Sequence, residues 1–124
     1  EPEAGTKQEV GIVVTHPWAA MGGNMDNNVP VEVTRALASM GHAALRFDFR
    51  GLGISRGSRE VADLVAAARW LLREVPGVRR VLLVGYSHGS VVAGAAFPEL
   101  GEAAAGLVTL SPPWPWAWLL FLGN

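Results

Sequence analysis

The sequence predicts an α/β fold in which a mainly parallel, doubly wound sheet carries helices on both faces. Short apolar segments alternate with longer amphipathic segments along the chain, a pattern that produces right-handed β-α-β crossovers between parallel strands. The apolar segments are short and β-branched or leucine-rich, as is typical of strands buried on both faces. About four strands and three helices fit a chain of 124 residues.

Each predicted strand is a short apolar run bounded by turn-forming residues such as Gly or Pro. The strands are expected over residues 10–16, 43–49, 80–86 and 105–111. In this fold class, ligands bind at the carboxyl ends of the strands, so the loops that follow them are the places to look for chemistry.

Three helical patterns separate the strands. The first covers residues 30–40, where Val33, Leu37 and Met40 recur on one face. The second covers residues 58–75 and stops before a Pro-Gly pair. The third begins just after Ser87 and stops before Pro98, and its small residues are expected to let it lie close to the sheet.

Composition describes one globular domain, residues 1–124, with a polar tail over residues 1–9. Half of the residues (50%) are hydrophobic, 17% are charged, and the net charge of -1 comes without the basic stripe that nucleic-acid binding needs. The chain has no cysteine and shows no signal peptide, which favours a reducing, cytoplasmic location. The apolar run 116–122 is far shorter than the ~20 residues of a transmembrane helix.

Ser87 is the candidate nucleophile because it stands in the pattern Gly85-Tyr86-Ser87-His88-Gly89. A G-x-S-x-G sequence between a strand and a helix is typical of a nucleophile elbow, in which a sharp turn lifts the serine above the sheet edge. Glycines two positions before and after it remove Cβ atoms that would clash. The alternative is a glycine-rich turn whose serine only caps a helix.

A loop also follows the first strand, and its backbone N–H groups are candidates for an oxyanion hole together with the amide of His88. With "THPW", "GGNMDNN", "LRFDFRGLGIS" and "GYSHG" in this order, the chain resembles the α/β-hydrolase superfamily, specifically its small esterase-like serine hydrolases. The resemblance implies that Trp18 supplies the second oxyanion amide. It also implies a partial α/β-hydrolase fold, in which Asp48, Arg50 and Gly51 begin a turn that shapes the loop beside the site.

Other assignments of the same residues are disfavoured. A dinucleotide fingerprint fails because the third glycine of G-x-G-x-x-G would fall on Arg56, and the three histidines lack metal-ligand spacing, so neither cofactor nor metal is expected. His88 adjoins Ser87 in a sharp turn and is expected to point elsewhere, while His16 is expected to bond to backbone and hold its loop. Asp48 precedes the serine, contrary to the family's Ser, Asp or Glu, His order.

After Ser87, the sequence offers only Glu99, Glu102 and His88 for a triad. The resemblance places the acid and the histidine after later strands, beyond Asn124, so the domain looks C-terminally truncated and the isolated chain is expected to show little turnover. An unpaired, apolar edge strand at residues 105–111 would agree with truncation. The tryptophans near the C-terminus either line a pocket or pack under further structure.

The expected function is that of a serine hydrolase which cleaves a carboxylic ester, thioester or similar acyl bond through an acyl-enzyme on Ser87. Its partner would be a small-molecule acyl substrate, whose identity the sequence does not indicate. The alternative is a catalytically inactive α/β-hydrolase-like protein that binds a ligand or another protein.

Overall fold

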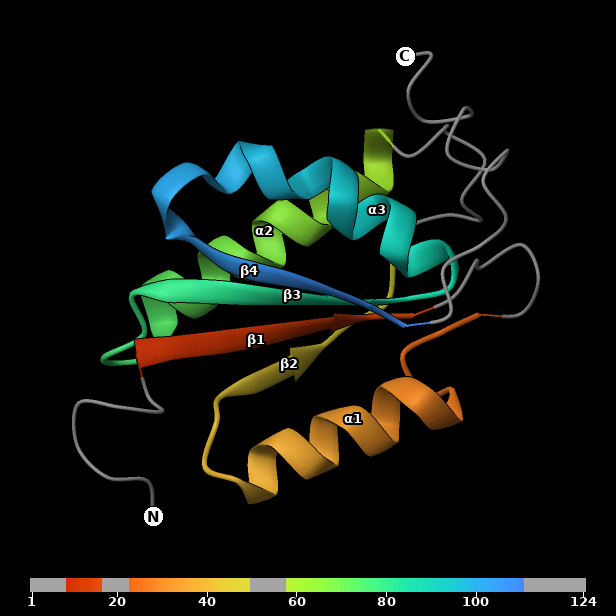
Figure 1. Cartoon of the computed structure of the whole chain (residues 1–124), viewed down its shortest axis with the longest axis horizontal. Coiled ribbons are helices and arrows are strands. Elements are labelled where there is room, and N and C mark those ends of the chain that lie inside the picture. Colours follow the sequence, from red (N-terminus) through yellow and green to blue (C-terminus); the bar gives the residue numbers. More distant parts are fainter. Residues whose placement is uncertain (1–8, 17–22, 50–57, 111–124) are drawn as a thin grey trace.

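The computed structural model describes residues 9–16, 23–49 and 58–110. In these ranges, four parallel strands form one sheet in the order β2-β1-β3-β4 (Figure 1). The strands are β1 (Val10–Thr15), β2 (Ala44–Arg46), β3 (Arg80–Tyr86) and β4 (Ala104–Leu110). The parallel α/β class predicted from the alternating pattern is therefore confirmed.

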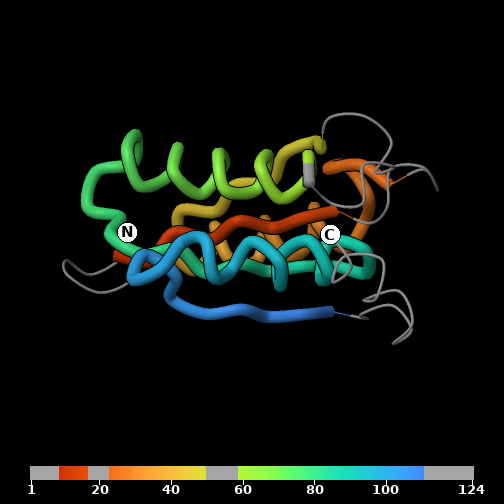
Figure 2. Tube along the Cα trace, turned by 90° about the horizontal axis from the view of Figure 1, so that it is seen from above, coloured from red at the N-terminus to blue at the C-terminus, as the bar shows by residue number. Residues whose placement is uncertain are grey.

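Helices cover both faces of this sheet. Figure 1 shows α1 (Asn28–Ser39) on one side and α2 (Ser58–Glu74) with α3 (His88–Ala96) on the other. A 3-10 helix, η3 (Phe97–Ala103), continues from α3 to β4. Figure 2 looks onto the layer of α2 and α3 and shows β4 at the edge of the molecule. No helix among the described segments has both the length and the apolar character needed to span a bilayer.

The core lies on the two faces of the central strands β1 and β3. Val13 of β1 packs with Leu64 of α2 and Val92 of α3, all at 0% exposure. Its neighbours Ile12 and Val14 point to the opposite face, where Val33 and Leu37 of α1 pack against them. Because successive strand residues face opposite sides, burial on both faces explains why β1 is apolar at consecutive positions.

The prediction of burial on both faces is wrong for the outer strands. Every residue of β2 is only partly buried, and in β4 Leu107 and Val108 remain 38% and 41% exposed. These strands lie at the two ends of the described sheet, where they have fewer covering elements. Met40 is also misassigned, because α1 ends at Ser39 and leaves the Met40 side chain 54% exposed.

β2 is shorter than the predicted range 43–49. It ends at Arg46, and the residues that follow make long-range bonds instead of sheet pairs. The Phe49 N–H donates to the His16 ring, and the Asp48 carboxylate accepts from the backbone of Met25. The alternating apolar pattern continues to Phe49, but these contacts direct the chain away from the strand ladder.

The topology identifies where a ligand site belongs. β1 leads to α1 on one face, whereas its neighbour β3 leads to α3 on the other face. Thr15 pairs with Gly85, so β1 and β3 end side by side. Adjacent strands whose connections diverge leave a crevice at their carboxyl ends, where parallel α/β sheets bind ligands. His16 and Ser87 follow these two strand ends.

Candidate functional site

Ser87 joins β3 directly to α3. β3 ends at Tyr86 and α3 begins at His88, so the strand and the helix that the elbow interpretation requires are both present. Ser87 has φ 54° and ψ −119°, and within the described chain it is the non-glycine residue at positive φ. Such a backbone conformation costs about 1–3 kcal/mol, and residues strained in this way cluster at functional sites. The side chain forms no capping hydrogen bond, so the interpretation as a simple helix cap is wrong.

Hydrogen bonds hold the Ser87 backbone in this conformation. Its N–H donates to the carbonyl of Leu110 at the end of β4, at 2.9 Å. Its own carbonyl accepts from the N–H of Ser90 at 2.9 Å, which closes the first turn of α3. The unusual dihedral angles are therefore fixed both by the neighbouring strand and by the helix that follows.

Gly85 and Gly89 permit the close approach of α3 to the sheet. A Cβ on Gly85 would lie 2.5 Å from both the Gly89 oxygen and the Ser90 Cα, and both of these are backbone atoms. A Cβ on Gly89 would overlap Thr15 Oγ1 and lie 2.8 Å from the backbone oxygen of His16. The two glycines of the motif thus serve distinct contacts, one within the turn and one between α3 and β1.

Ser90 is a supporting residue that the sequence reasoning missed. It is 0% exposed, and its Oγ donates to the Gly85 carbonyl at 2.8 Å, with the Leu110 carbonyl at 3.4 Å. A buried hydroxyl requires such a partner, and here it ties the first turn of α3 to the ends of β3 and β4. The available signal was its position three residues after Ser87, on the helix face turned toward the sheet.

His16 occupies the end of β1 with its side chain fully enclosed. It is 1% exposed, and its Nε2 accepts a hydrogen bond from the Phe49 backbone N–H at 3.0 Å. The two rings meet edge to face with centroids 4.7 Å apart. An accepting Nε2 carries no proton, so the neutral ring has its proton on Nδ1. The bond to backbone was expected, and it engages the nitrogen that a catalytic base would need.

His88 is half-buried at the start of α3. Burial lowers its pKa below 6.5, the nearby Glu60 acts in the opposite direction, and His16 lowers the pKa further. Burial outweighs the carboxylate, so the His88 ring is neutral near pH 7. Glu60 lies in the first turn of α2 and is 1% exposed. Glu60 was not singled out from the sequence as a site residue, and the burial of this carboxylate near His88 was not foreseen.

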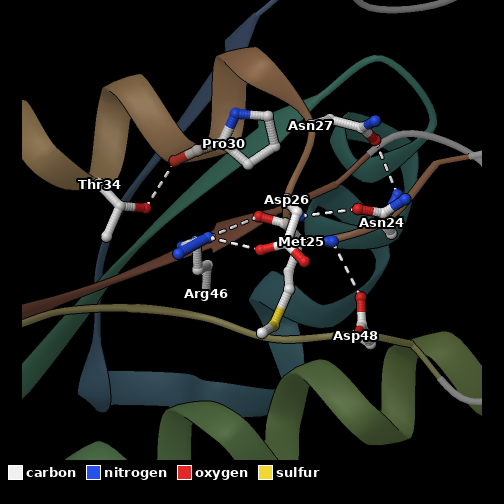
Figure 3. A network of polar contacts seen from close by, with 8 residues as sticks. All are labelled: Asn24, Met25, Asp26, Asn27, Pro30, Thr34, Arg46 and Asp48. Carbon is white, nitrogen blue, oxygen red and sulfur yellow. Dashed lines mark hydrogen bonds and ion pairs between the residues drawn. The ribbon is translucent and has the colours of Figure 1, made fainter.

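A polar network lies beside this site, in the segment that leads from β1 to α1 (Figure 3). The exposed Asp48 accepts a hydrogen bond from the N–H of Met25 at 2.9 Å. Arg46 donates to the carbonyl of Met25 at 2.9 Å and pairs with Asp26 at 3.3 Å. Arg46, a charged residue within an apolar strand pattern, was not singled out from the sequence, although that contrast was a usable signal.

Several candidate residues lie outside the described ranges. These are Trp18, Arg50 and Gly51, so the roles predicted for them stay predictions. Within the described ranges, no three or more His, Cys, Asp or Glu side chains are grouped to hold a metal ion.

The arrangement suits attack by a serine on a carbonyl carbon. Ser87 stands at the positive N-terminal end of α3, where backbone N–H groups favour developing negative charge. A base must also reach the serine hydroxyl. Of the two described histidines beside the turn, His16 uses Nε2 on Phe49, and His88 follows the serine directly in a sharp turn. The nucleophilic role of Ser87 and the oxyanion role of the His88 amide stay predictions.

Comparison with known proteins agrees with this geometry. Over residues 12–123, the chain matches the protein family described as "alpha/beta hydrolase fold". The solved structure of a protein from Xanthomonas campestris, described as an a/b serine hydrolase without lid, aligns with TM-score 0.75 and 33% identity. An alpha-beta serine hydrolase homologue from Coxiella burnetii aligns with TM-score 0.75 and 30% identity.

The chain spans only part of each relative. The alignments cover 90% of this chain and 52% of the Xanthomonas protein, and 94% and 57% in the Coxiella comparison. An uncharacterized protein of Rickettsia prowazekii is 36% identical over 86 residues, which make up 65% of this chain and 36% of that relative.

Proposed function

The chain belongs to the alpha/beta hydrolase fold family, and on this basis we propose that its protein is a serine hydrolase which cleaves a carboxylic ester, thioester or similar acyl bond. One observation carries the proposal, the positive φ of Ser87 between β3 and α3. A strained serine backbone at a strand-to-helix turn is the geometry that presents a nucleophile above a parallel sheet. The similarity to two proteins named serine hydrolases supports the same assignment.

In the proposed reaction, Ser87 Oγ attacks the acyl carbon and its proton passes to a histidine base. The carbonyl π electrons move to the oxygen, which becomes an oxyanion. Collapse of this intermediate expels the alcohol or thiol, which receives the proton, and leaves an acyl-enzyme on Ser87. Water then attacks the acyl carbon, with the histidine taking its proton. The bond between this carbon and Ser87 Oγ breaks, Oγ receives the proton, and the acid product leaves. The amides of His88 and Trp18 are the proposed donors to the oxyanion.

The base and its orienting acid are proposed to lie in a segment of the protein beyond residue 124. The part of the sequence after Ser87 contains Glu99, Glu102 and His88 as its carboxyl and imidazole groups. Both glutamates belong to η3, which leads to the start of β4, whereas Ser87 follows the end of β3. Parallel strands start and end at opposite edges of the sheet, so these carboxylates are far from the serine.

The test is covalent labelling of the full-length protein with a fluorophosphonate, which reacts with activated serines, together with turnover of p-nitrophenyl acetate. The wild type is expected to label and turn over, and Ser87→Ala to do neither. Ser39→Ala is the matched control, because Ser39 is an exposed serine near the end of α1. Equal labelling of wild type and Ser87→Ala would refute the assignment of Ser87 as the nucleophile. A wild type that neither labels nor hydrolyses esters or thioesters would favour the alternative, a catalytically silent binding protein.

A further inference from the structure

Two polar side chains that flank the end of β2 hold a single residue of the neighbouring loop. The Asp48 carboxylate accepts from the Met25 N–H, and the Arg46 guanidinium donates to the Met25 carbonyl, each at 2.9 Å. Figure 3 shows Met25 between these two side chains. Arg46 also pairs with Asp26, the next residue, at 3.3 Å. Both backbone polar groups of Met25 are therefore held by residues that lie 23 and 21 positions away in sequence.

The turn that contains Met25 is also closed by its own residues. The Asn24 N–H donates to the Asn27 side chain at 2.7 Å, and the Asp26 N–H donates to the Asn24 side chain at 2.8 Å. A backbone bond from the Asn27 N–H to the Asn24 carbonyl, at 3.1 Å, completes the turn. These short-range bonds hold residues 24–27 together as one turn that leads directly into α1. A displacement of Met25 is therefore expected to move the whole turn.

The other end of the same loop is held by the same short segment. His16, at the end of β1, accepts from the Phe49 N–H at 3.0 Å. Arg46, Asp48 and Phe49 thus contact the chain on both sides of residues 17–22. The end of β2 fixes where the loop after β1 departs and where it returns.

We propose that Arg46 and Asp48 are positioning residues for acyl transfer, which act through their hydrogen bonds to the backbone of Met25. The inference rests on the proposed function, which assigns an oxyanion donor to the loop between His16 and Met25. The Arg46–Asp26 pair is partly exposed, at 30% and 73%, and exposed ion pairs contribute little to stability, so the loss of this pair is expected to leave the fold intact. Reaction rates are far more sensitive, because a displacement of about 1 Å can cost roughly 100-fold.

The test compares variants of the full-length protein in the hydrolysis of p-nitrophenyl acetate. Asp48→Ala and Arg46→Ala each remove one bond to Met25 and are expected to lower kcat at least about tenfold, with KM changed less than about twofold. Asp48→Asn keeps an oxygen acceptor and is expected to retain most of kcat. Affinity for phenylboronic acid, which binds serine hydrolases as a tetrahedral adduct, should fall in parallel with kcat.

Glu32→Ala and Arg35→Ala are the charge-matched controls, since both residues are exposed on α1 and paired only at 4.0 Å. Variants of Arg46 and Asp48 that behave like these controls would overturn the proposal, as would a change in KM alone or equal losses in Asp48→Ala and Asp48→Asn. If Asp48→Ala does not fold, Arg46→Ala carries the test. Ser87→Ala separates the two hypotheses: its retained turnover refutes the proposed function, whereas its loss beside unaffected Arg46 and Asp48 variants refutes only the positioning role.

Discussion

Replacing Gly85 by alanine tests whether the close packing of the turn determines the position of Ser87. The new Cβ would lie 2.5 Å from Gly89 O and Ser90 Cα, and ordinary contact begins at 3.4 Å, so the first turn of α3 must move by about 0.9 Å. Overpacking of this kind costs about 1–3 kcal/mol of stability. Because the displaced atoms directly follow Ser87, the same movement should slow fluorophosphonate labelling by roughly 100-fold.

The matched control is Gly101→Ala. Gly101 has φ 54°, so alanine is strained there, but its Cβ would meet nothing within 4 Å. The expected loss of stability is about 1–2 kcal/mol, similar to that of Gly85→Ala, with an unchanged labelling rate. Urea unfolding measures the free energy of unfolding. The rate of fluorophosphonate labelling under native conditions measures the reactivity of Ser87. Wild-type labelling of a folded Gly85→Ala variant would refute the reasoning that this contact positions Ser87.

Three further predictions concern burial and pH. Ser90→Ala should lower the unfolding free energy by about 1–3 kcal/mol in urea titrations, because the buried Gly85 carbonyl loses its donor; an unchanged midpoint would contradict this. Leu64→Ala should cost about 2–5 kcal/mol at a fully buried site, whereas Val108→Ala, 41% exposed, should stay within about 0.5 kcal/mol. Burial holds the pKa of His88 below 6.5, so the unfolded chain binds a proton first as pH falls and stability decreases below about pH 6.5. His88→Gln should flatten the dependence of Tm on pH in this range, and an equal slope in both proteins would exclude His88 as its source.

Much of the fold was readable from local patterns. The range of β3 was predicted to the residue, and α2 and α3 began where glycine, serine and the apolar periodicity indicated. These elements lie over the central core, where consecutive apolar residues leave few alternatives. The errors concern Met40 at the end of α1, the length of β2 and the burial of the two outer strands. The edge position of the last strand was expected, but the sequence of a strand alone does not show how far neighbouring elements cover its faces.

In the candidate site, too, the local features were predicted from the sequence and the long-range contacts were not. Ser87 and its two glycines follow from one short motif whose geometry is local. The partners of most supporting contacts could not be predicted, because these contacts join residues that are distant in sequence. The hydrogen bond between His16 and Phe49 spans 33 positions in the sequence, and the hydrogen bond from Arg46 to Met25 spans 21. Glu60 illustrates the same limit, as an acidic first turn is usually exposed, but here the packing of α2 buries it.

The hydrogen bond from Ser87 to Leu110 also makes the site dependent on the order of synthesis. Ser87 leaves the ribosome 23 residues before Leu110, the difference between 110 and 87, and its N–H partner does not exist until then. At about 5–20 residues per second, this interval lasts roughly 1–5 s. During that time β3 and α3 can form, but the carbonyl that holds the serine backbone at positive φ is missing. A nascent chain can therefore hold the Ser87 backbone in this conformation only once β4 has joined the sheet.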